Sequence, residues 1–178
     1  MDEREFDVIL YGASGFTGRQ TVAYFRDHAP VGLRWAVAGR NEAKLRAITA
    51  ELMPEQPPKV LVADGHDRPA LDALCRKTRV VLTTAGPFSS YGRSLVDACV
   101  EHHTHYADIT GETPFVADLI RDHHEAALQS GTRIIPFAGF DSVPSDLGAF
   151  VCAEELRSQG TATKRLVSAF KVRGGLNG

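Results

Sequence analysis

The chain has 178 residues, of which 43% are apolar and 24% are charged, and its 20 Lys and Arg residues against 22 Asp and Glu residues leave a net charge of −2. This length favours one domain that buries its own core without metals or disulfides. The near balance of charge excludes a polybasic surface and a highly charged disordered tail, so we expect no nucleic-acid partner.

The cysteines and the N-terminus indicate the compartment. Cys75, Cys99 and Cys152 are widely spaced and odd in number, and no CxxC pair occurs, which argues against a disulfide framework and a cysteine zinc site. The first residues are acidic rather than basic, and no apolar run approaches the roughly 18 residues of a membrane span. We therefore expect a cytoplasmic protein with no membrane partner.

Apolar runs of strand length alternate with longer helical patterns along the chain. We expect strands at about 6–12, 33–39, 59–63, 79–85, 105–109, 133–138 and 165–172. We expect helices at about 15–28, 41–53, 68–77, 89–103, 114–130 and 144–158. Strands rich in Val, Ile and Leu without polar alternation are typical of a parallel sheet covered on both faces. The order predicts a doubly wound α/β domain with a mostly parallel sheet and helices on both faces, in which Pro136 places its strand at an edge or bends it.

A glycine-rich turn, GASGFTG at residues 12–18, follows the first predicted strand where a helix is expected to begin. Gly12 permits a tight turn, Gly15 lets backbone N–H groups approach a pyrophosphate, and Gly18 allows the helix to pack closely on the strand. The helix N-terminus adds unpaired N–H donors and partial positive charge. The spacing is GxxGxxG rather than the commoner GxGxxG, but the strand before and the helix after favour a dinucleotide-binding turn over one that only packs.

The end of the second predicted strand discriminates between NAD and NADP. NAD-binding domains carry Asp or Glu there for the ribose hydroxyls, whereas this chain reads Ala38-Gly39-Arg40-Asn41. Gly39 leaves room and the Arg40 guanidinium suits a 2′-phosphate, although an ordinary surface arginine is the alternative. Asn41 can cap the next helix, and Lys44 either adds charge to the site or is simply solvated. We predict NADP as the cofactor.

Two further turns follow strands at the same edge of the predicted sheet. Asp64 and Gly65 come after the third strand, where such folds often meet the adenine, although a simple turn fits equally well. Ala85, Gly86 and Pro87 come after the fourth strand, beside the point where the strand order reverses. We expect the nicotinamide ribose there, with the cofactor lying against the backbone of Ala85 and Gly86.

Several catalytic patterns are missing from the sequence. None of the four tyrosines is followed four positions later by lysine, and there is no GxSxG, no HExxH and no GK[ST]. The cluster of His102, His103 and His105 is read as surface histidines near a helix end, so no metal site is expected. Ser142 or Asp141 is expected to cap the helix that follows them.

Four motifs carry a resemblance over about residues 6 to 175: FDVILYGASGFTGR, AGRNEAKL, TTAGPFSSYGRSLVDACVEHHTHYADITGE and AGFDSVPSDLG. The chain resembles the NADP-binding domain of saccharopine dehydrogenase-like oxidoreductases, and within them the branch that includes trans-acting enoyl reductases of lipid biosynthesis. The resemblance implies a Rossmann domain, residues 1–178 here, followed by a separate α/β domain for substrate contacts and dimerisation. It places the 2′-phosphate of NADP at Arg40 and the nicotinamide near Ala85, Gly86 and Pro87. It implies that NADP binds in the glycine turn formed by Gly12, Ser14, Gly15, Phe16, Thr17 and Gly18.

The same resemblance implies that the Tyr91-Gly92 turn and Thr110-Gly111-Glu112 line the cofactor cleft. It supplies no established catalytic residue. Tyr91 and Glu112 remain as candidate proton donors beside water and the second domain, and a carboxyl donor would need its pKa raised by burial.

Residues 173–178 are rich in glycine and directly follow the predicted last strand, so we expect a truncated protein whose substrate domain is absent from this sequence. The leading hypothesis is an NADP(H)-dependent oxidoreductase that transfers a hydride to or from an unknown small substrate, such as an enoyl or lipid-type compound. The present residues are expected to bind cofactor with little or no turnover, and any homodimer to form through the second domain. The alternatives are a non-catalytic NADP(H)-sensing regulatory protein and an assembly subunit that binds no dinucleotide.

Overall fold

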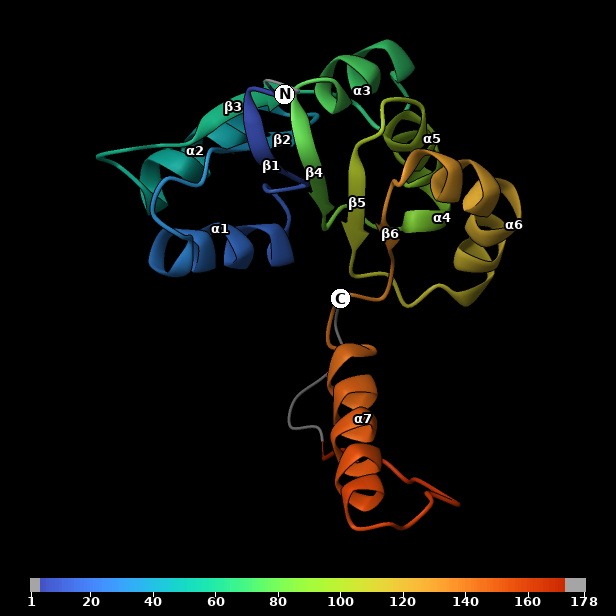
Figure 1. The fold of residues 1–178 in the computed structure, drawn as a ribbon. Coiled ribbons are helices and arrows are strands. Elements are labelled where there is room, and N and C mark those ends of the chain that lie inside the picture. Colours follow the sequence, from blue (N-terminus) through green and yellow to red (C-terminus); the bar gives the residue numbers. More distant parts are fainter. Residues whose placement is uncertain (1–3, 172–178) are drawn as a thin grey trace.

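A computed structural model describes residues 4–171 of the chain. Its centre is a six-stranded sheet in the order β3-β2-β1-β4-β5-β6, and every neighbouring pair is parallel (Figure 1). The strands are β1 (Phe6–Tyr11), β2 (Trp35–Gly39), β3 (Lys59–Val62), β4 (Thr78–Thr83), β5 (His105–Asp108) and β6 (Ile134–Ile135). The strand order reverses at β1 and β4, so the carboxyl ends of these two strands mark the expected crevice for a ligand.

Helices connect the strands and lie on both faces of the sheet, as Figure 1 shows. They are α1 (Phe16–His28), α2 (Glu42–Leu52), α3 (Arg68–Cys75), α4 (Phe88–Tyr91), α5 (Arg93–Glu101), α6 (Thr113–Ser130) and α7 (Val143–Ser158). Val22 of α1 and Leu45 of α2 belong to the apolar core on one face. A larger core on the other face takes its side chains from α3, α5 and α6. The predicted doubly wound α/β class, with a parallel sheet and helices on both faces, is confirmed.

Most predicted boundaries differ from the observed ones by one to three residues. The helix predicted at 89–103 is interrupted at Gly92, where a Cβ atom would lie 2.8 Å from the ring of Phe115. Gly131 ends α6 in a left-handed conformation with φ of 71°, as expected of a C-terminal glycine. β6 is an edge strand that ends directly before Pro136, because proline has no N–H for a sheet hydrogen bond.

The strand predicted at 165–172 is wrong for residues 165–171, which are irregular and exposed. Residue 172 and the glycine-rich residues 173–178 lie outside the described part of the chain. A strand needs a neighbouring strand to pair its backbone groups. This segment lies away from the edge of the sheet, and the ring of Phe170 contacts that of Phe140 instead, with centroids 5.8 Å apart.

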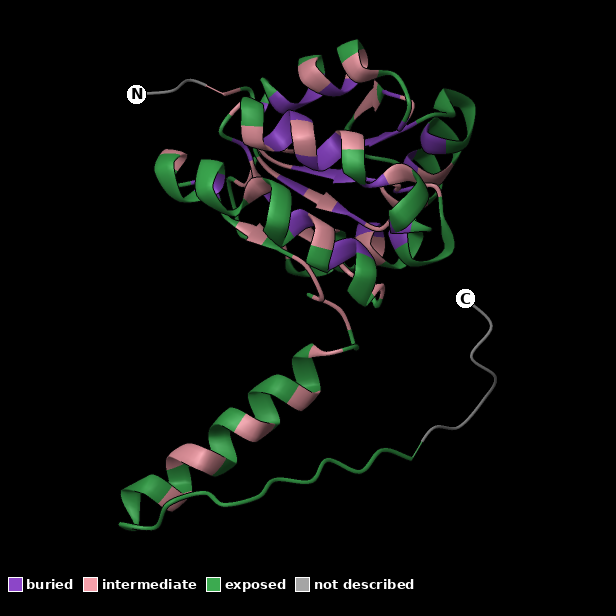
Figure 2. Cartoon of the chain, turned by 90° about the vertical axis from the view of Figure 1, so that its right-hand side faces the viewer, coloured by how far each residue is buried: buried purple, intermediate pink, exposed green. Residues whose placement is uncertain are grey.

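The helix predicted at 144–158 is present as α7, and it extends away from the sheet (Figures 1 and 2). None of its side chains is buried. The expected capping is wrong: Ser142 occupies the N-cap position, but its side chain makes no capping hydrogen bond. The second helical residue is Pro144, which has no N–H to donate to a cap. Within residues 4–171, no helix combines the length and the hydropathy that crossing a bilayer requires.

Candidate cofactor-binding site

A cleft of about 200 Å³ opens at the carboxyl ends of β1, β2, β3 and β4. It brings together seven residues that the sequence predicts as cofactor-binding, namely Gly12, Ser14, Gly15, Arg40, Asp64, Ala85 and Gly86. The lining also includes Tyr11, Gly39, Gly65, Thr84 and Tyr91. The cleft therefore lies at the switch point, where open α/β sheets bind their ligands.

The glycines that shape the turn after β1 are required by its geometry. Gly12 has φ of 84°, and a Cβ atom there would lie 2.8 Å from both the Cβ and the backbone nitrogen of Ala85. A Cβ atom on Gly18 would lie 2.2 Å from the carbonyl oxygen of Gly12 and 2.7 Å from the Cα of Ala13. Both approaches are shorter than real side chains tolerate, so these two glycines let the loop after β4 and helix α1 close on the turn.

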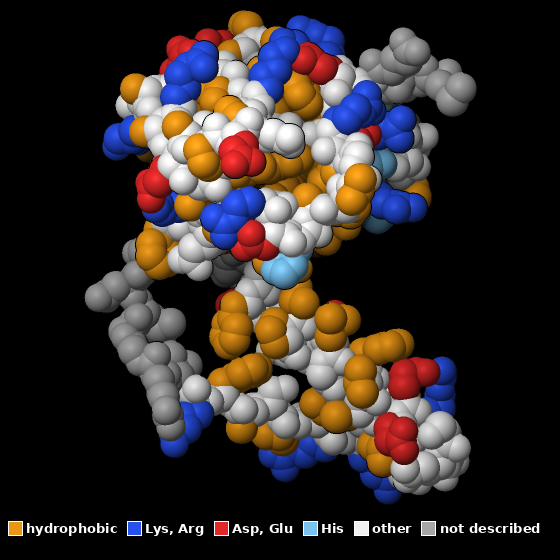
Figure 3. All heavy atoms as spheres, turned by 90° about the vertical axis from the view of Figure 1, so that its left-hand side faces the viewer, with side chains coloured by type: hydrophobic (Ala, Val, Ile, Leu, Met, Phe, Trp, Pro, Cys, Tyr) orange, Lys and Arg blue, Asp and Glu red, His pale blue; other side chains and the backbone are white. Residues whose placement is uncertain are grey.

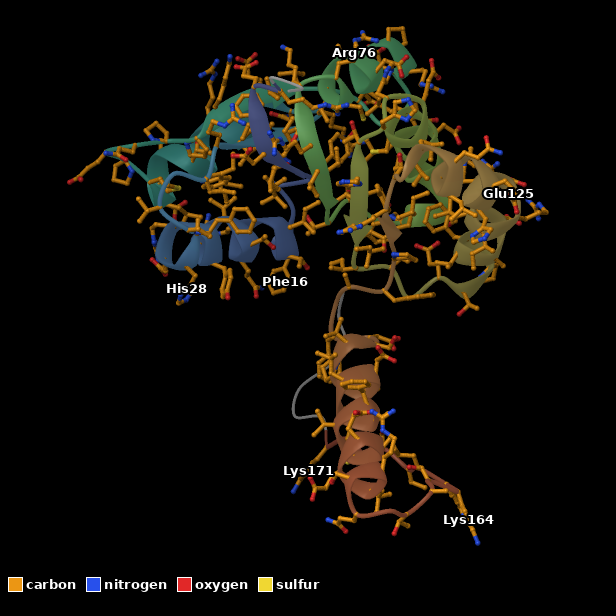
Figure 4. All side chains as sticks on the ribbon, viewed as in Figure 1. Phe16, His28, Arg76, Glu125, Lys164 and Lys171 are labelled. Carbon is orange, nitrogen blue, oxygen red and sulfur yellow. The ribbon has the colours of Figure 1, made fainter. Side chains whose placement is uncertain are left out.

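The N-terminus of α1 has the features that favour binding of an anion. Gly15 occupies the N-cap position without a side-chain cap, and the first turn of α1 contains no acidic residue. The first N–H groups of a helix have no partner within it, and they carry the positive end of the helix dipole. Phe16 is 81% exposed at the start of α1 (Figure 4) and Thr17 is exposed, so these two predicted residues offer backbone donors rather than cleft-lining side chains.

Arg40 follows β2 directly and lines the cleft. Its side chain is exposed, and within the described residues its guanidinium has no hydrogen bond or ion pair. Asn41 caps α2 as predicted, since its side-chain oxygen accepts a hydrogen bond from the backbone N–H of Lys44 at 2.9 Å. The end of β2 thus presents an unpaired cation beside a capped helix and, as the sequence indicates, no carboxylate.

Tyr11 is a cleft residue that the sequence reasoning missed. Its hydroxyl donates to the carbonyl oxygen of Ala63 at 3.1 Å. Burial raises the pKa of this phenol to about 12, the negative charge of Asp64 adds to the rise, and Arg40 opposes it. Tyr11 is the last residue of β1, directly before the glycine turn, and this position at the carboxyl end of a central parallel strand is the signal that could have identified it.

This raised pKa predicts a loss of stability at high pH. A phenol whose pKa is higher in the folded than in the unfolded chain stabilises below pH 10, and that contribution is lost as pH rises towards 12. Relative to Tyr11→Phe, the unmodified chain should lose about 1.4 kcal/mol of unfolding free energy between pH 8 and pH 11. Urea unfolding of both proteins at the two pH values measures this, and an unchanged difference between them would contradict it.

Asp64 makes a turn and also lines the cleft, and its contact with the adenine stays a prediction. Its side-chain oxygen accepts the N–H of His66 at 2.9 Å, and its carbonyl oxygen accepts the N–H of Asp67 at 3.1 Å. The predicted residue Pro87 is exposed at the start of α4 and does not line the cleft.

Glu112 lies outside the cleft and holds the loop after β4. Its two carboxylate oxygens accept the backbone N–H groups of Phe88 at 2.7 Å and Ser89 at 3.0 Å. Hydrogen bonding by Ser89 lowers the pKa of Glu112 below its usual value. An ionised carboxylate accepts hydrogen bonds and has no proton to donate. Thr110 and Gly111 do not line the cleft either, and the hydroxyl of Thr110 accepts the N–H of Glu112 at 3.0 Å.

Asp108 is a second residue that the sequence reasoning missed. Its carboxylate is fully buried at the end of β5, where it accepts the hydroxyl of Tyr106 at 2.8 Å. It also accepts the N–H groups of Thr110 at 3.0 Å and of Phe137 at 3.2 Å. Burial raises the pKa of Asp108, and these hydrogen bonds partly offset the rise. Asp108 therefore ties the loop after β5 to the loop after β6, and through Thr110 it supports Glu112.

The clustered histidines have different surroundings in the fold. His102 ends α5 with its Nε2 atom 3.1 Å from a carboxylate oxygen of Asp72, and the Nδ1 atom of His105 in β5 accepts the N–H of Arg133 at 3.1 Å. His103 is exposed. In the part of the chain that the structure describes, no group of three or more histidine, cysteine or acidic side chains is arranged to hold a metal ion.

Comparison with known proteins gives concordant matches. The family model described as "Saccharopine dehydrogenase NADP binding domain" matches residues 8–135. A protein of Mycobacterium leprae named trans-acting enoyl reductase is 45% identical over 150 residues, which are 84% of this chain and 36% of that protein. The chain thus spans little more than a third of the length of this relative.

Among solved structures, apo saccharopine dehydrogenase (L-Glu forming) from Saccharomyces cerevisiae matches 87% of this chain with a TM-score of 0.68 and 21% identity, over 32% of its own length. A short-chain dehydrogenase/reductase from Veillonella parvula in complex with NADP matches 74% of this chain with a TM-score of 0.51 and 14% identity, over 68% of its own length. These two likenesses show the shared fold.

Proposed function

Because the chain belongs to the saccharopine dehydrogenase NADP-binding domain family, we propose that it is the cofactor-binding part of an oxidoreductase that transfers a hydride to or from a small substrate. The observation that carries this proposal is the combination of an uncapped helix N-terminus and Arg40 in one cleft. The first suits the pyrophosphate of a dinucleotide, and the second suits a 2′-phosphate.

The fit to NADP follows from the shape and charge of the cleft. Gly12 and Gly15 leave the turn without side chains where a pyrophosphate would approach, and Arg40 has no other ionic partner within residues 4–171. The bound cofactor supplies the hydride chemistry. The protein residues bind the phosphates, orient the dinucleotide across the sheet edge and hold the loop after β4 in place through Glu112.

We propose an enoyl or lipid-type compound as the substrate, on the strength of the relatives that are named trans-acting enoyl reductases. The substrate contacts are proposed to come from a further domain, because the chain spans about a third of the length of such a relative. The apolar surface of α7 supports this. Leu147, Phe150 and Val151 are 56%, 61% and 63% exposed, and Figure 3 shows hydrophobic side chains along this helix. Apolar exposure on this scale is typical of an interface.

The proton donor is proposed to be water or a residue of that further domain. Glu112 is engaged with two backbone N–H groups, and its lowered pKa keeps it ionised at neutral pH. A homodimer, where one forms, is proposed to use the further domain as well.

Titration of the chain with NADPH and NADH tests the cofactor proposal. We expect tighter binding of NADPH, and we expect Arg40→Ala to weaken NADPH binding by about 10- to 100-fold while NADH binding changes little, because charge-assisted hydrogen bonds to the 2′-phosphate are lost. Arg46→Ala is the matched control, since Arg46 lies on α2 and pairs with Glu42 rather than lining the cleft. Equal affinities for the two cofactors, or an unchanged preference in Arg40→Ala, would overturn the proposal.

A further inference from the structure

Tyr91 lies on the side of the cleft that is formed by the loop after β3. It is the last residue of α4, it is half-buried, and it lines the cleft although α4 follows β4. A Cβ atom on Gly65 would lie 3.5 Å from both the Cβ and the carbonyl oxygen of Tyr91. The ring of Tyr91 also contacts the ring of His66, with centroids 5.1 Å apart and planes tilted by 52°. Tyr91 therefore packs against the loop that follows β3.

The order of groups along a dinucleotide assigns this side of the cleft. With the pyrophosphate at the turn of Gly12 and Gly15 and the 2′-phosphate at Arg40, the adenine continues outward past β2. The sheet order places β3 directly beyond β2. The loop after β3, with Gly65 and His66, is thus the adenine side, and the nicotinamide extends in the opposite direction over β4 and β5.

We propose that Tyr91, supported by His66, forms the aromatic wall against which the adenine of NADP packs. Tyr91 is then a binding residue and not the proton donor, because the reacting carbon of the cofactor lies at the other end of the dinucleotide. The inference rests on the proposed NADP binding. The ring of Tyr91 is itself planar and polarisable, the tilted ring of His66 supports it from one side, and aromatic side chains stack on nucleobases irrespective of base-specific hydrogen bonds. Within residues 4–171 the hydroxyl of Tyr91 makes no hydrogen bond, and the proposed contact with the adenine uses the ring.

Binding of three ligands to Tyr91 variants tests the inference. The probes are NADPH, adenosine 2′,5′-bisphosphate and nicotinamide mononucleotide. We expect Tyr91→Ala to weaken binding of NADPH and of the bisphosphate by the same factor, about tenfold, and to leave binding of the mononucleotide unchanged. Tyr91→Phe should restore the affinity for both adenine-containing ligands to within about twofold, since it keeps the ring.

The chain offers a matched control. Tyr24 and His28 form another Tyr–His ring pair, with centroids 4.4 Å apart, on α1 and outside the cleft. Tyr24→Ala should leave all three affinities unchanged. An unchanged affinity of Tyr91→Ala for the bisphosphate, or a loss confined to NADPH and the mononucleotide, would overturn the inference.

Two further observations keep the test decisive. If circular dichroism shows that Tyr91→Ala does not fold, His66→Ala replaces it, because this variant changes an exposed side chain. His66→Ala should weaken binding of the bisphosphate by a few-fold. An unchanged affinity of His66→Ala for the bisphosphate would also overturn the inference. Failure of the proposed function has a different signature, because the unmodified chain would then bind neither NADPH nor the bisphosphate.

Discussion

Replacing Gly18 with alanine is expected to abolish NADPH binding and to lower the free energy of unfolding by at least about 3 kcal/mol. The added Cβ atom would lie 2.2 Å from the carbonyl oxygen of Gly12 and 2.7 Å from the Cα of Ala13. Both are backbone atoms, so no side-chain rotation relieves the clash. Helix α1 must move away from the turn, and its N-terminal donors then leave the position that a pyrophosphate needs.

The chain contains a control for this substitution. Gly148 also lies within a helix, α7, but a Cβ atom there would meet nothing within 4 Å. Gly148→Ala should raise stability by up to about 1 kcal/mol through helix propensity alone, without a change in NADPH affinity. Urea unfolding and NADPH titration of both variants measure the contrast. If Gly18→Ala binds NADPH as tightly as Gly148→Ala, the close packing of α1 on the turn is not what shapes the site.

The parts of the site that could be predicted from the sequence are those set by local chemistry. Gly12 and Gly18 are dictated by a backbone angle and by a close approach within seven residues of chain, and both constraints are present in the structure. Asn41 caps α2 for an equally local reason. Arg40 follows from the identity of the residue at the end of one strand, and parallel strands bring their carboxyl ends to one edge of the sheet.

The parts that could not be predicted depend on contacts between distant residues. The guanidinium of Arg4 donates to the carbonyl oxygens of Cys75, Thr78 and His102, which are 71 to 98 residues away. The segment at 165–171 has a strand-like sequence, yet no strand forms without a neighbour to pair with. The position of Tyr91 beside Gly65 likewise depends on how α4 packs across the sheet edge.

Asp108 illustrates this limit and provides the second large prediction. A single aspartate at the end of a short strand resembles many turn residues in the sequence, but its carboxylate is fully buried and holds three donors from three positions. Asp108→Ala should lower the free energy of unfolding by about 3 to 5 kcal/mol, because the buried donors of Tyr106 and Thr110 and the partly buried N–H of Phe137 lose their acceptor. The variant should also weaken binding of both NADPH and adenosine 2′,5′-bisphosphate, since Glu112 holds the start of α4, the helix that carries Tyr91.

Asp108→Asn separates hydrogen bonding from charge. The Oδ1 atom of Asp108 accepts both backbone N–H groups, and its Oδ2 atom accepts only the hydroxyl of Tyr106. An asparagine keeps the first acceptor, and its amide can donate to the Tyr106 hydroxyl, which also accepts hydrogen bonds. It also removes a charge whose burial is unfavourable, as the raised pKa of Asp108 indicates. We therefore expect the free energy of unfolding of Asp108→Asn to lie within about 1 kcal/mol of that of the unmodified chain.

Chemical denaturation of these variants beside Asp118→Ala completes the test, because Asp118 is partly exposed and pairs with Arg121 on the surface of α6. Loss of that exposed ion pair should change stability far less than loss of the buried carboxylate. If Asp108→Ala and Asp118→Ala unfold at the same urea concentration, the loops after β5 and β6 are held by other contacts. If instead Asp108→Asn is as unstable as Asp108→Ala, the negative charge of Asp108, rather than its hydrogen bonds, holds the loops together.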